Sequence, residues 1–454
     1  MARTVKTLAL LISLLLIMFG LTWSLPTAQA ADTVAFQPRF TSNVNGAIVA
    51  IGNALLTCPE EAGGLTTPEW AEHCQSAKGG VHYDDNSFIM KPLDADGDAF
   101  PTSSSSMSEL NLPLGAKVLW AGLYWGARLA PGEGGTAGVG DPGKMSLRPP
   151  GATAYQTIQA STVFGPNGAS SGAYQGFADV TAAVAKAGRG QYWAGDIVTG
   201  TGKDRYAGWS LLVAYSAPSL PLRNLTVFDG FAMVAGGQPQ KITLSGFTAP
   251  LDGPVDTSLS MVAYEGDLTQ SGDYVNLNDS QLATAISPGS NFFNSTNDWM
   301  GQSVTSRTPA DRNMLGFDVK NLTVSGAIGN GDSQAVLTFD STGDTYYPGV
   351  LATAINLYSP DFTASSKTVH NLNGSDLVRP GDTLVYTVDY VNSGQDGAIS
   401  VVSHDQLPAG VSYLPGSLEL VSGPGVSAGR ALTDSAGDDV GEVTGGQVIV
   451  RRGV

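Results

Sequence analysis

Three carboxylates stand two residues apart at Asp94, Asp96 and Asp98, with Gly97 among them. Several carboxylate oxygens in one tight loop are the ligands that calcium prefers. A full twelve-residue calcium loop ends in a bidentate glutamate, whereas the twelfth position counted from Asp94 is Ser105. The stretch is therefore not an EF-hand, and it predicts either another kind of calcium loop or a solvated turn of Asp and Gly.

A second acidic group, Glu265, Asp267 and Asp273, lies in the stretch YEGDLTQSGDY. Two such carboxylates can share a cation, or they can serve as the acid and base of a glycoside hydrolase. A hydrolase needs its pair in a cleft, and proximity in sequence does not establish a cleft. We expect a structural or calcium-binding loop here, with catalysis the less favoured alternative.

Other catalytic signatures are missing from the sequence. The four histidines, at positions 73, 82, 370 and 404, stand in neither a G-x-S-x-G nor an H-E-x-x-H pattern. The glycine-rich stretch 132–140 lacks the Gly-Lys-Ser/Thr ending of a phosphate loop. We therefore predict no catalytic residues, no enzyme activity and no cofactor other than calcium.

Aromatic side chains raise a lectin-like alternative, because rings on the surface of a β-sandwich can stack on sugars. Tryptophan in an apolar strand more often packs in a core. A lectin requires exposed rings in a groove beside the acidic loops, and a spacer requires buried rings. The rings in question are Trp120, Tyr124, Trp125, Tyr192, Trp193, Tyr206 and Trp209.

The first thirty residues have the order of a secretory signal peptide. Arg3 and Lys6 precede an apolar run over 8–21, and the small-residue site 28–30 predicts cleavage after Ala30. An uncleaved anchor helix is less favoured, because the run is shorter than the ~20 residues that a bilayer requires. We expect a secreted, extracellular or cell-wall protein whose mature chain has no membrane span.

Cys58 and Cys74 are the only two cysteines. In an exported protein they predict a disulfide, which would close a loop of about 15 residues and contribute about 3 kcal/mol. Zinc is less favoured, since His73 and His82 do not complete a recognised spacing.

Composition also restricts the partners. The chain has 40 acidic against 23 basic residues, a net charge of −17. Nucleic acid is excluded as an expected partner, because binding to phosphate requires clustered Lys and Arg.

Short apolar alternations separated by Gly, Pro, Asn and Asp run through the chain, as in AKVLWAGLYWGARL. They predict an all-β protein of tandem β-sandwiches, with a jelly-roll-like or Greek-key region over 31–358. We expect this region to hold two sandwiches with a boundary near 245–255. One short helix is predicted near 179–187, capped by Asp179 and ended by Gly188.

A polar, proline-bearing stretch at 359–366 predicts a linker to a second module over 367–454. In that module, RPGDTLVYTVDYVNSG alternates apolar and polar residues and ends in a turn. Together with VVSHDQLPAGVSYLPGSLEL, it resembles the repeat module called domain of unknown function eleven. The resemblance implies an immunoglobulin-like sandwich in a secreted or cell-wall protein of bacteria, with a stalk or spacer role. Such modules continue beyond a segment like 446–453, so we expect this one to be C-terminally incomplete.

The region before the linker resembles an uncharacterised segment that precedes such modules in bacterial surface proteins, through stretches such as WAGLYWGAR and GDTYYPGVLATAINLYSP. One further hypothesis concerns the module itself. Lys367 and Asn392 would form an intramolecular isopeptide bond if they met beside Asp382 or Asp389.

These observations favour a structural or adhesive protein of the cell surface without catalytic activity. Its expected partners are cell-wall components, glycans or other surface proteins. A carbohydrate-binding module is the alternative, and a glycoside hydrolase is the third.

Overall fold

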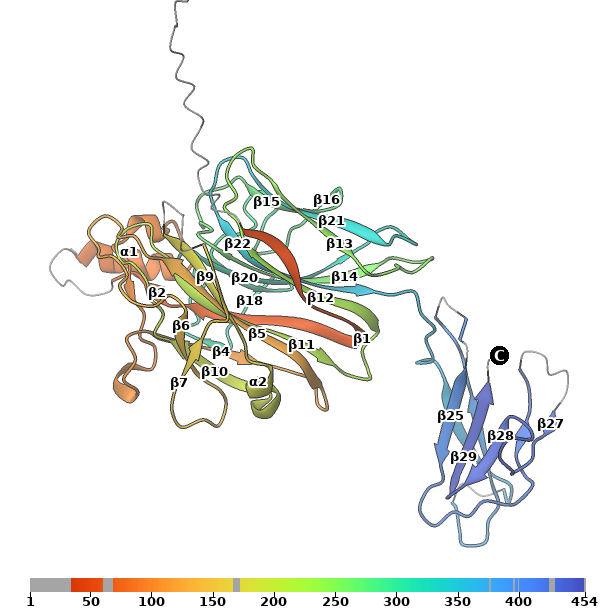
Figure 1. Cartoon of the computed structure of the whole chain (residues 1–454). Helices are drawn as coiled ribbons and strands as arrows, with labels where there is room; N and C mark the ends of the chain where they lie inside the picture. The colour runs from red at the N-terminus through yellow and green to blue at the C-terminus, as the bar shows by residue number, and fades with distance from the viewer. Residues whose placement is uncertain are drawn as a thin grey trace, which may run out of the picture.

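The computed structural model describes residues 34–59, 68–165, 172–374, 377–394, 397–398, 400–423 and 429–452 (Figure 1). The predicted signal peptide over 1–30 lies outside these residues. Within them the protein is all-β, as predicted, and its two α-helices are short: α1 (Pro68–Lys78) and α2 (Thr181–Ala187). Neither is long and apolar enough to cross a bilayer.

The largest sheet has eleven strands. In spatial order they are β18 (Gln302–Ser303), β17 (Asn297–Trp299), β20 (Phe317–Ser325), β14 (Asp256–Tyr264), β22 (Tyr347–Asn356), β12 (Leu222–Phe231), β1 (Val34–Ala54), β11 (Ala207–Ser216), β5 (Lys117–Arg128), β9 (Ala173–Asp179) and β8 (Thr162–Phe164). The long strand β1 pairs with β12 along 34–45 and with β11 along 46–54. It therefore joins two halves of the sheet, the β12 half and the β11 half.

The two halves face each other across a shared core. That core contains Leu212 and Phe177 from the β11 half and Val262 and Phe317 from the β12 half. Glycines allow a close approach, since a methyl group at Gly208 would lie 2.4 Å from the Phe317 ring.

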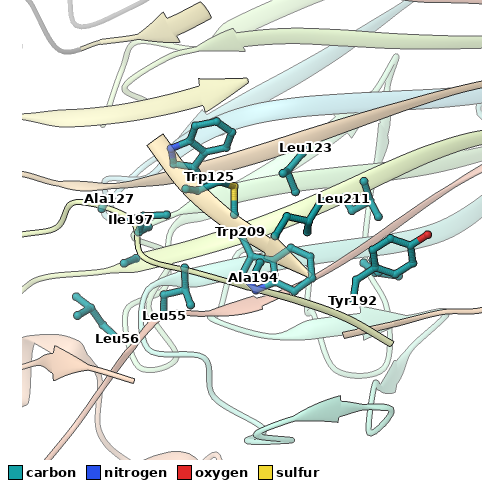
Figure 2. Close-up of a cluster of buried hydrophobic side chains, with 14 of the residues drawn as sticks. Leu55, Leu56, Leu123, Trp125, Ala127, Tyr192, Ala194, Ile197, Trp209 and Leu211 are labelled. Carbon is teal, nitrogen blue, oxygen red and sulfur yellow. The ribbon is translucent and has the colours of Figure 1, made fainter. Parts of the chain in front are cut away.

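Smaller sheets cover the outer face of each half. The β11 half packs against five strands, β19 (Arg307–Thr308), β4 (Ser105–Leu110), β10 (Gly190–Gly195), β6 (Lys144–Arg148) and β7 (Gln156–Gln159). Figure 2 shows this core, with Trp125, Trp209 and Tyr192 among its largest side chains. The β12 half packs against β13 (Gln240–Ser245), β21 (Gln334–Ser341), β15 (Asp273–Leu277) and β16 (Ser280–Gln281).

The segment 245–255, where the sequence predicts a boundary between sandwiches, connects β13 to β14. Phe247, Ala249 and Val255 are buried there in the same core that holds Leu244 and Leu259. The chain thus changes sheets at this point without leaving that core.

The helices confirm one expectation and add one element. The helix is present near the predicted position, but its N-cap residue is Val180 and not Asp179, which lies one residue earlier and accepts the Thr181 N–H at 2.9 Å. Gly188 ends the helix as predicted, with φ +68°. Helix α1 was not predicted, and the expectation of a single helix was wrong. Cys58, after β2 (Leu56–Thr57), and Cys74 in α1 form the predicted disulfide, and both are buried. Strand β2 pairs with β3 (Lys91–Pro92).

Residues 366–452 form sheets that pair only among themselves within the described residues. Their strands are β23 (Ser366–Asn371) with β24 (Leu384–Asp389), β25 (Val401–Gln406) with β29 (Gln447–Arg452) and β28 (Gly441–Thr444), and β26 (Glu419–Leu420) with β27 (Arg430–Ala431). Strand β24 has the predicted alternation, because Leu384, Tyr386 and Val388 are less exposed than the residues between them. Of the large apolar side chains described there, only Leu432 and Ile449 are buried.

Candidate functional site

Four carboxylates, Asp84, Asp85, Glu265 and Asp267, lie close together within residues 34–357 and are called here the acidic cluster. Asp85 opens a short 3₁₀ helix, η1 (Asp85–Ser87), and Glu265 and Asp267 directly follow β14. The backbone of Glu265 is held at φ +70°, which is uncommon for a residue other than glycine. A hydrogen bond from its N–H to the Gly316 carbonyl, at 2.7 Å, fixes this turn.

Hydrogen bonds join the two segments of the acidic cluster across about 180 residues of chain. The Asn86 amide donates to Asp267 Oδ2 at 2.8 Å. Asp84 Oδ1 accepts the Leu268 N–H at 2.7 Å, and its other oxygen accepts the Thr269 hydroxyl. Asp84 therefore stabilises the turn after β14.

Three oxygens of the acidic cluster lack a donor. They are Asp85 Oδ2, Glu265 Oε2 and Asp267 Oδ1, each inaccessible to solvent. Asp85 and Asp267 are each 1% exposed. Burial of a carboxyl group without a donor favours its protonated form.

Burial is the main cause of raised pKa values in the acidic cluster. It raises the pKa of Asp85, which the charge of Asp204 raises further, and it raises the pKa of Asp267, which the charge of Asp85 raises further. The pKa of Glu265 is also well above its usual range, because of burial and then the charge of Asp85. Nearby Asp344 has a pKa raised to about 7, again chiefly by burial. The site can therefore hold protons at neutral pH.

Asp273, which the sequence grouped with Glu265 and Asp267, has other partners. Its Oδ2 accepts the Phe293 N–H at 2.6 Å, and burial raises its pKa to about 6. Among the described residues, no three His, Cys, Asp or Glu side chains are arranged to hold a metal ion. The calcium hypothesis for this stretch stays a prediction.

The loop of Asp94 and Asp96 is closed by internal hydrogen bonds. Ser105 Oγ lies 2.8 Å from Asp94 Oδ1 and 2.7 Å from Asp96 Oδ1, and the Tyr155 hydroxyl donates to Asp96 Oδ2 at 2.6 Å. Burial would raise the pKa of Asp96, but the hydrogen bonds from Tyr155 and Ser105 outweigh it and lower that pKa. Asp98 lies in η2 (Gly97–Ala99), and its side chain is outside the described part.

Six of the seven aromatic rings considered for sugar stacking are buried in the cores, and the seventh, Trp193, is partly exposed. Trp193 and Arg148 line a surface depression of about 240 Å³ together with Gln191 and Pro149 to Gly151. The Arg148 guanidinium lies 5.1 Å from the Trp193 ring and 3.9 Å from Asp96 Oδ2. This depression therefore adjoins the Asp96 loop.

Lys367 and Asn392 have different partners. Lys367 Nζ contacts the Asp405 carboxylate and lies 4.7 Å from the centre of the Tyr386 ring. Asn392 Oδ1 accepts the Asp361 N–H at 2.9 Å, which ties the linker to the end of β24. Neither contact joins the two residues of the proposed bond.

Sequence reasoning missed Asp84 and Asp85, although the adjacent acids in VHYDDN were a visible signal. It also missed Asp318 and Lys320, two charged residues at alternate positions of an apolar strand. Residues two apart in a strand share a face. Their burial therefore requires mutual pairing.

Comparison with family models and with curated proteins finds no match to this chain. Among solved structures, the major capsid protein P2 from bacteriophage PM2 is 10% identical. The alignment covers 56% of this chain and 98% of that chain with a TM-score of 0.16. A likeness at this level supports no argument about fold or function.

Proposed function

We propose that the protein is a structural or adhesive β-sandwich protein of the bacterial cell surface, without catalytic activity. The observation that supports the proposal is the burial of the residues that were candidates for sugar binding or catalysis. The aromatic rings are buried apart from Trp193, and the acidic cluster is closed in by the protein. Buried rings stabilise a scaffold, and enclosed carboxylates do not meet a polysaccharide, whereas a hydrolase requires its carboxylates in an open cleft.

The location and the role have separate tests. Antibodies against residues 34–357 should label intact producing cells or precipitate the protein from the medium, and protease added to intact cells should remove the label. Retention inside the cells would overturn the proposed location. Hydrolysis of cell-wall glycans by the purified chain, lost in Glu265→Gln, would overturn the non-catalytic role.

The depression beside Trp193 favours a carbohydrate-binding alternative. A partly exposed indole, a guanidinium and the exposed Gln191 amide offer stacking and hydrogen bonds to a sugar. Its volume of about 240 Å³ is below the ~300–1,000 Å³ of most small-molecule sites. The depression itself therefore matches a single sugar ring.

Titration of cell-wall oligosaccharides against the chain and against Trp193→Ala separates the two functions. The lectin alternative requires binding that Trp193→Ala abolishes. Substitution of Trp299, which is exposed elsewhere on the domain, is the matched control. Binding that survives Trp193→Ala would remove the depression as the site.

A further inference from the structure

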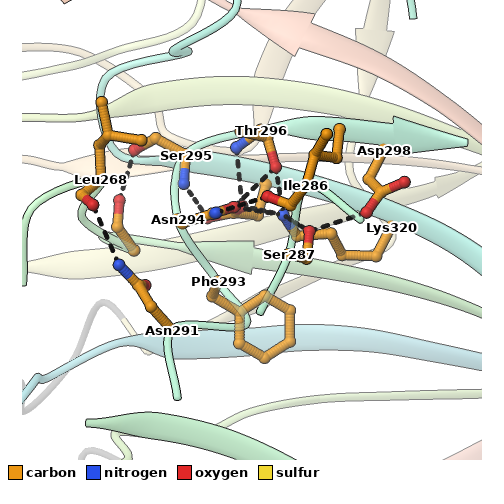
Figure 3. Close-up of polar contacts among 12 residues, drawn as sticks. Leu268, Ile286, Ser287, Asn291, Phe293, Asn294, Ser295, Thr296, Asp298 and Lys320 are labelled. Atoms are coloured by element: carbon orange, nitrogen blue, oxygen red, sulfur yellow. Dashed lines mark hydrogen bonds and ion pairs between the residues drawn. The ribbon is translucent and has the colours of Figure 1, made fainter. Parts of the chain in front are cut away.

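A buried lysine lies in the core between the β12 half and its covering sheet. Lys320 is on β20 and is 1% exposed, and Asp318, two residues earlier on the same face, is fully buried. Lys320 Nζ lies 2.9 Å from Asp318 Oδ1. Figure 3 shows Lys320 reaching into the loop that precedes β17.

That loop surrounds the amine with oxygen atoms. Lys320 Nζ lies 2.9 Å from both Ser287 Oγ and Asn294 Oδ1, and it also contacts the Thr296 hydroxyl. With Asp318 there are four acceptors, whereas an ammonium group has three hydrogens to donate. The three hydrogens cannot serve all four acceptors. Among these acceptors only Asp318 is a carboxylate, so it is the group that can take a proton from the ammonium.

The Asn294 carboxamide is held in place on both sides. Its nitrogen donates to the Ile286 carbonyl at 2.8 Å, and its oxygen accepts from the Thr296 hydroxyl at 2.7 Å. Asn294 is 5% exposed, so the amine and the carboxamide meet away from bulk water. Fixed, close reactants of this kind react as if at very high concentration.

The Asp318 carboxylate is fixed by the same loop. Its Oδ2 accepts the Ser295 N–H at 3.0 Å, and its Oδ1 accepts the Thr296 N–H at 2.9 Å. Burial disfavours the separated charges of a lysine and an aspartate, so transfer of one proton to Asp318 yields a neutral amine and a neutral acid at lower desolvation cost.

We propose that Lys320 and Asn294 form an intramolecular isopeptide bond with Asp318 as the proton carrier. Asp318 takes one proton from the Lys320 ammonium, and the free amine attacks Asn294 Cγ. The new Nζ–Cγ bond forms as the Cγ–Nδ2 bond breaks, and Asp318 returns that proton to the departing nitrogen. The attacking Nζ then passes its second proton to Asp318, which ends the reaction protonated. One ammonia leaves, and no oxidant or other reactant is needed.

The bond would fasten the loop before β17 covalently to β20. This loop carries Phe292 and Phe293 into the core of the β12 half. The bond would therefore keep these side chains in that core. The proposal is independent of the proposed function, because it concerns only the chemistry of the three side chains.

Tryptic digestion of the denatured, reduced chain tests the bond directly. Between residues 242 and 367, lysine or arginine occurs only at 307, 312, 320 and 367. With Lys320 acylated, trypsin does not cleave after it. Peptide 242–307 should then appear joined to peptide 313–367, lighter than their sum by one ammonia. Separate peptides 242–307, 313–320 and 321–367 would overturn the proposal.

Variants assign the roles of the three side chains. Asn294→Ala and Lys320→Arg should each release the separate peptides, and Asp318→Asn should do so with both reacting groups still present. Asn291→Ala, which alters a neighbouring buried amide that contacts Asp267 and Leu268 carbonyls, should leave the joined product intact. Loss of one water within peptide 313–367 would instead indicate a bond to Asp318 and would overturn the assignment to Asn294. The wild-type digest decides the matter even where a variant does not fold.

Discussion

At the scale of residues, the protein keeps its buried carboxylates in two different states. Asp96 accepts several hydrogen bonds as an anion, and its pKa is lowered. Burial raises the pKa values of Asp85 and Asp267, and one oxygen of each has no donor. Burial and the hydrogen bonds that a carboxylate accepts together decide which state is favoured.

Tyr155→Phe removes one donor to the Asp96 carboxylate and should lower the free energy of unfolding by about 1 to 2 kcal/mol at pH 7. The loss should vanish at low pH, because a lowered pKa contributes stability that is lost as pH falls through it. Chemical denaturation at pH 7 and pH 3 measures both effects. Tyr274→Phe, at a part-buried Tyr–Asp hydrogen bond of 2.8 Å, is the matched control. It should cost less, because burial is the main cause of the raised tyrosine pKa at Tyr155 but not at Tyr274. An equal loss from both variants would contradict the role of burial.

Asp85→Asn should have the opposite pH dependence. Because the pKa values of the acidic cluster are raised in the folded state, the folded chain binds more protons than the unfolded chain above about pH 4. Wild-type stability should therefore fall as pH rises toward 8. Asp85→Asn should be more stable than wild type at pH 8 by about 1 to 3 kcal/mol, with little difference at pH 4. Denaturation curves at both pH values measure this, and the exposed Glu109→Gln is the control.

Calcium provides a second comparison for the acidic cluster. If protons neutralise the acidic cluster, the wild-type melting temperature at pH 8 should be the same with calcium and with a chelator. A rise with calcium, absent in Asp85→Asn, would show that a cation neutralises the acidic cluster in place of a proton.

At the scale of elements, β1 joins the two halves of the large sheet, and glycines determine how closely they face each other. Gly208→Ala would place a methyl group 2.4 Å from the Phe317 ring of the opposite half. Overpacking of this kind should lower the free energy of unfolding by about 1 to 3 kcal/mol. Denaturant titration measures the loss. Gly397→Ala, where a methyl group meets nothing within 4 Å, should have almost no effect.

Elements were more predictable than contacts. Local alternation predicted β24, and local capping residues predicted α2, because both signals lie within a few residues. Helix α1 escaped prediction: its mean hydropathy is low and its apolar periodicity is weak. The acidic cluster was not predicted, because Asn86 and Asp267 are 181 residues apart in sequence and are brought into contact only by the fold. The same holds for Lys320 and Asn294, which the fold brings together from a strand and a loop.

At the scale of the whole molecule, the cores of the two parts are unequal. Residues 34–357 contain three clusters of buried apolar side chains, whereas ten large apolar side chains are exposed among the described residues of 366–452. Stability from burial scales with the apolar area removed from water. The C-terminal part should therefore have the lower free energy of unfolding. In the proposed spacer role, the N-terminal part should resist unfolding by force better than the C-terminal part.

Calorimetry of the full chain should accordingly show two transitions, with residues 366–452 unfolding at the lower temperature. Gly208→Ala should lower only the upper transition, and Leu432→Ala, which truncates one of the few buried side chains of the C-terminal part, should lower only the lower one. Each variant thus serves as the control for the other, since the strands of the two parts pair separately. A single transition shifted by both variants would show that the two parts unfold as one cooperative unit. The chain would then act as a rigid body, and the linker at 359–366 would not serve as a flexible joint.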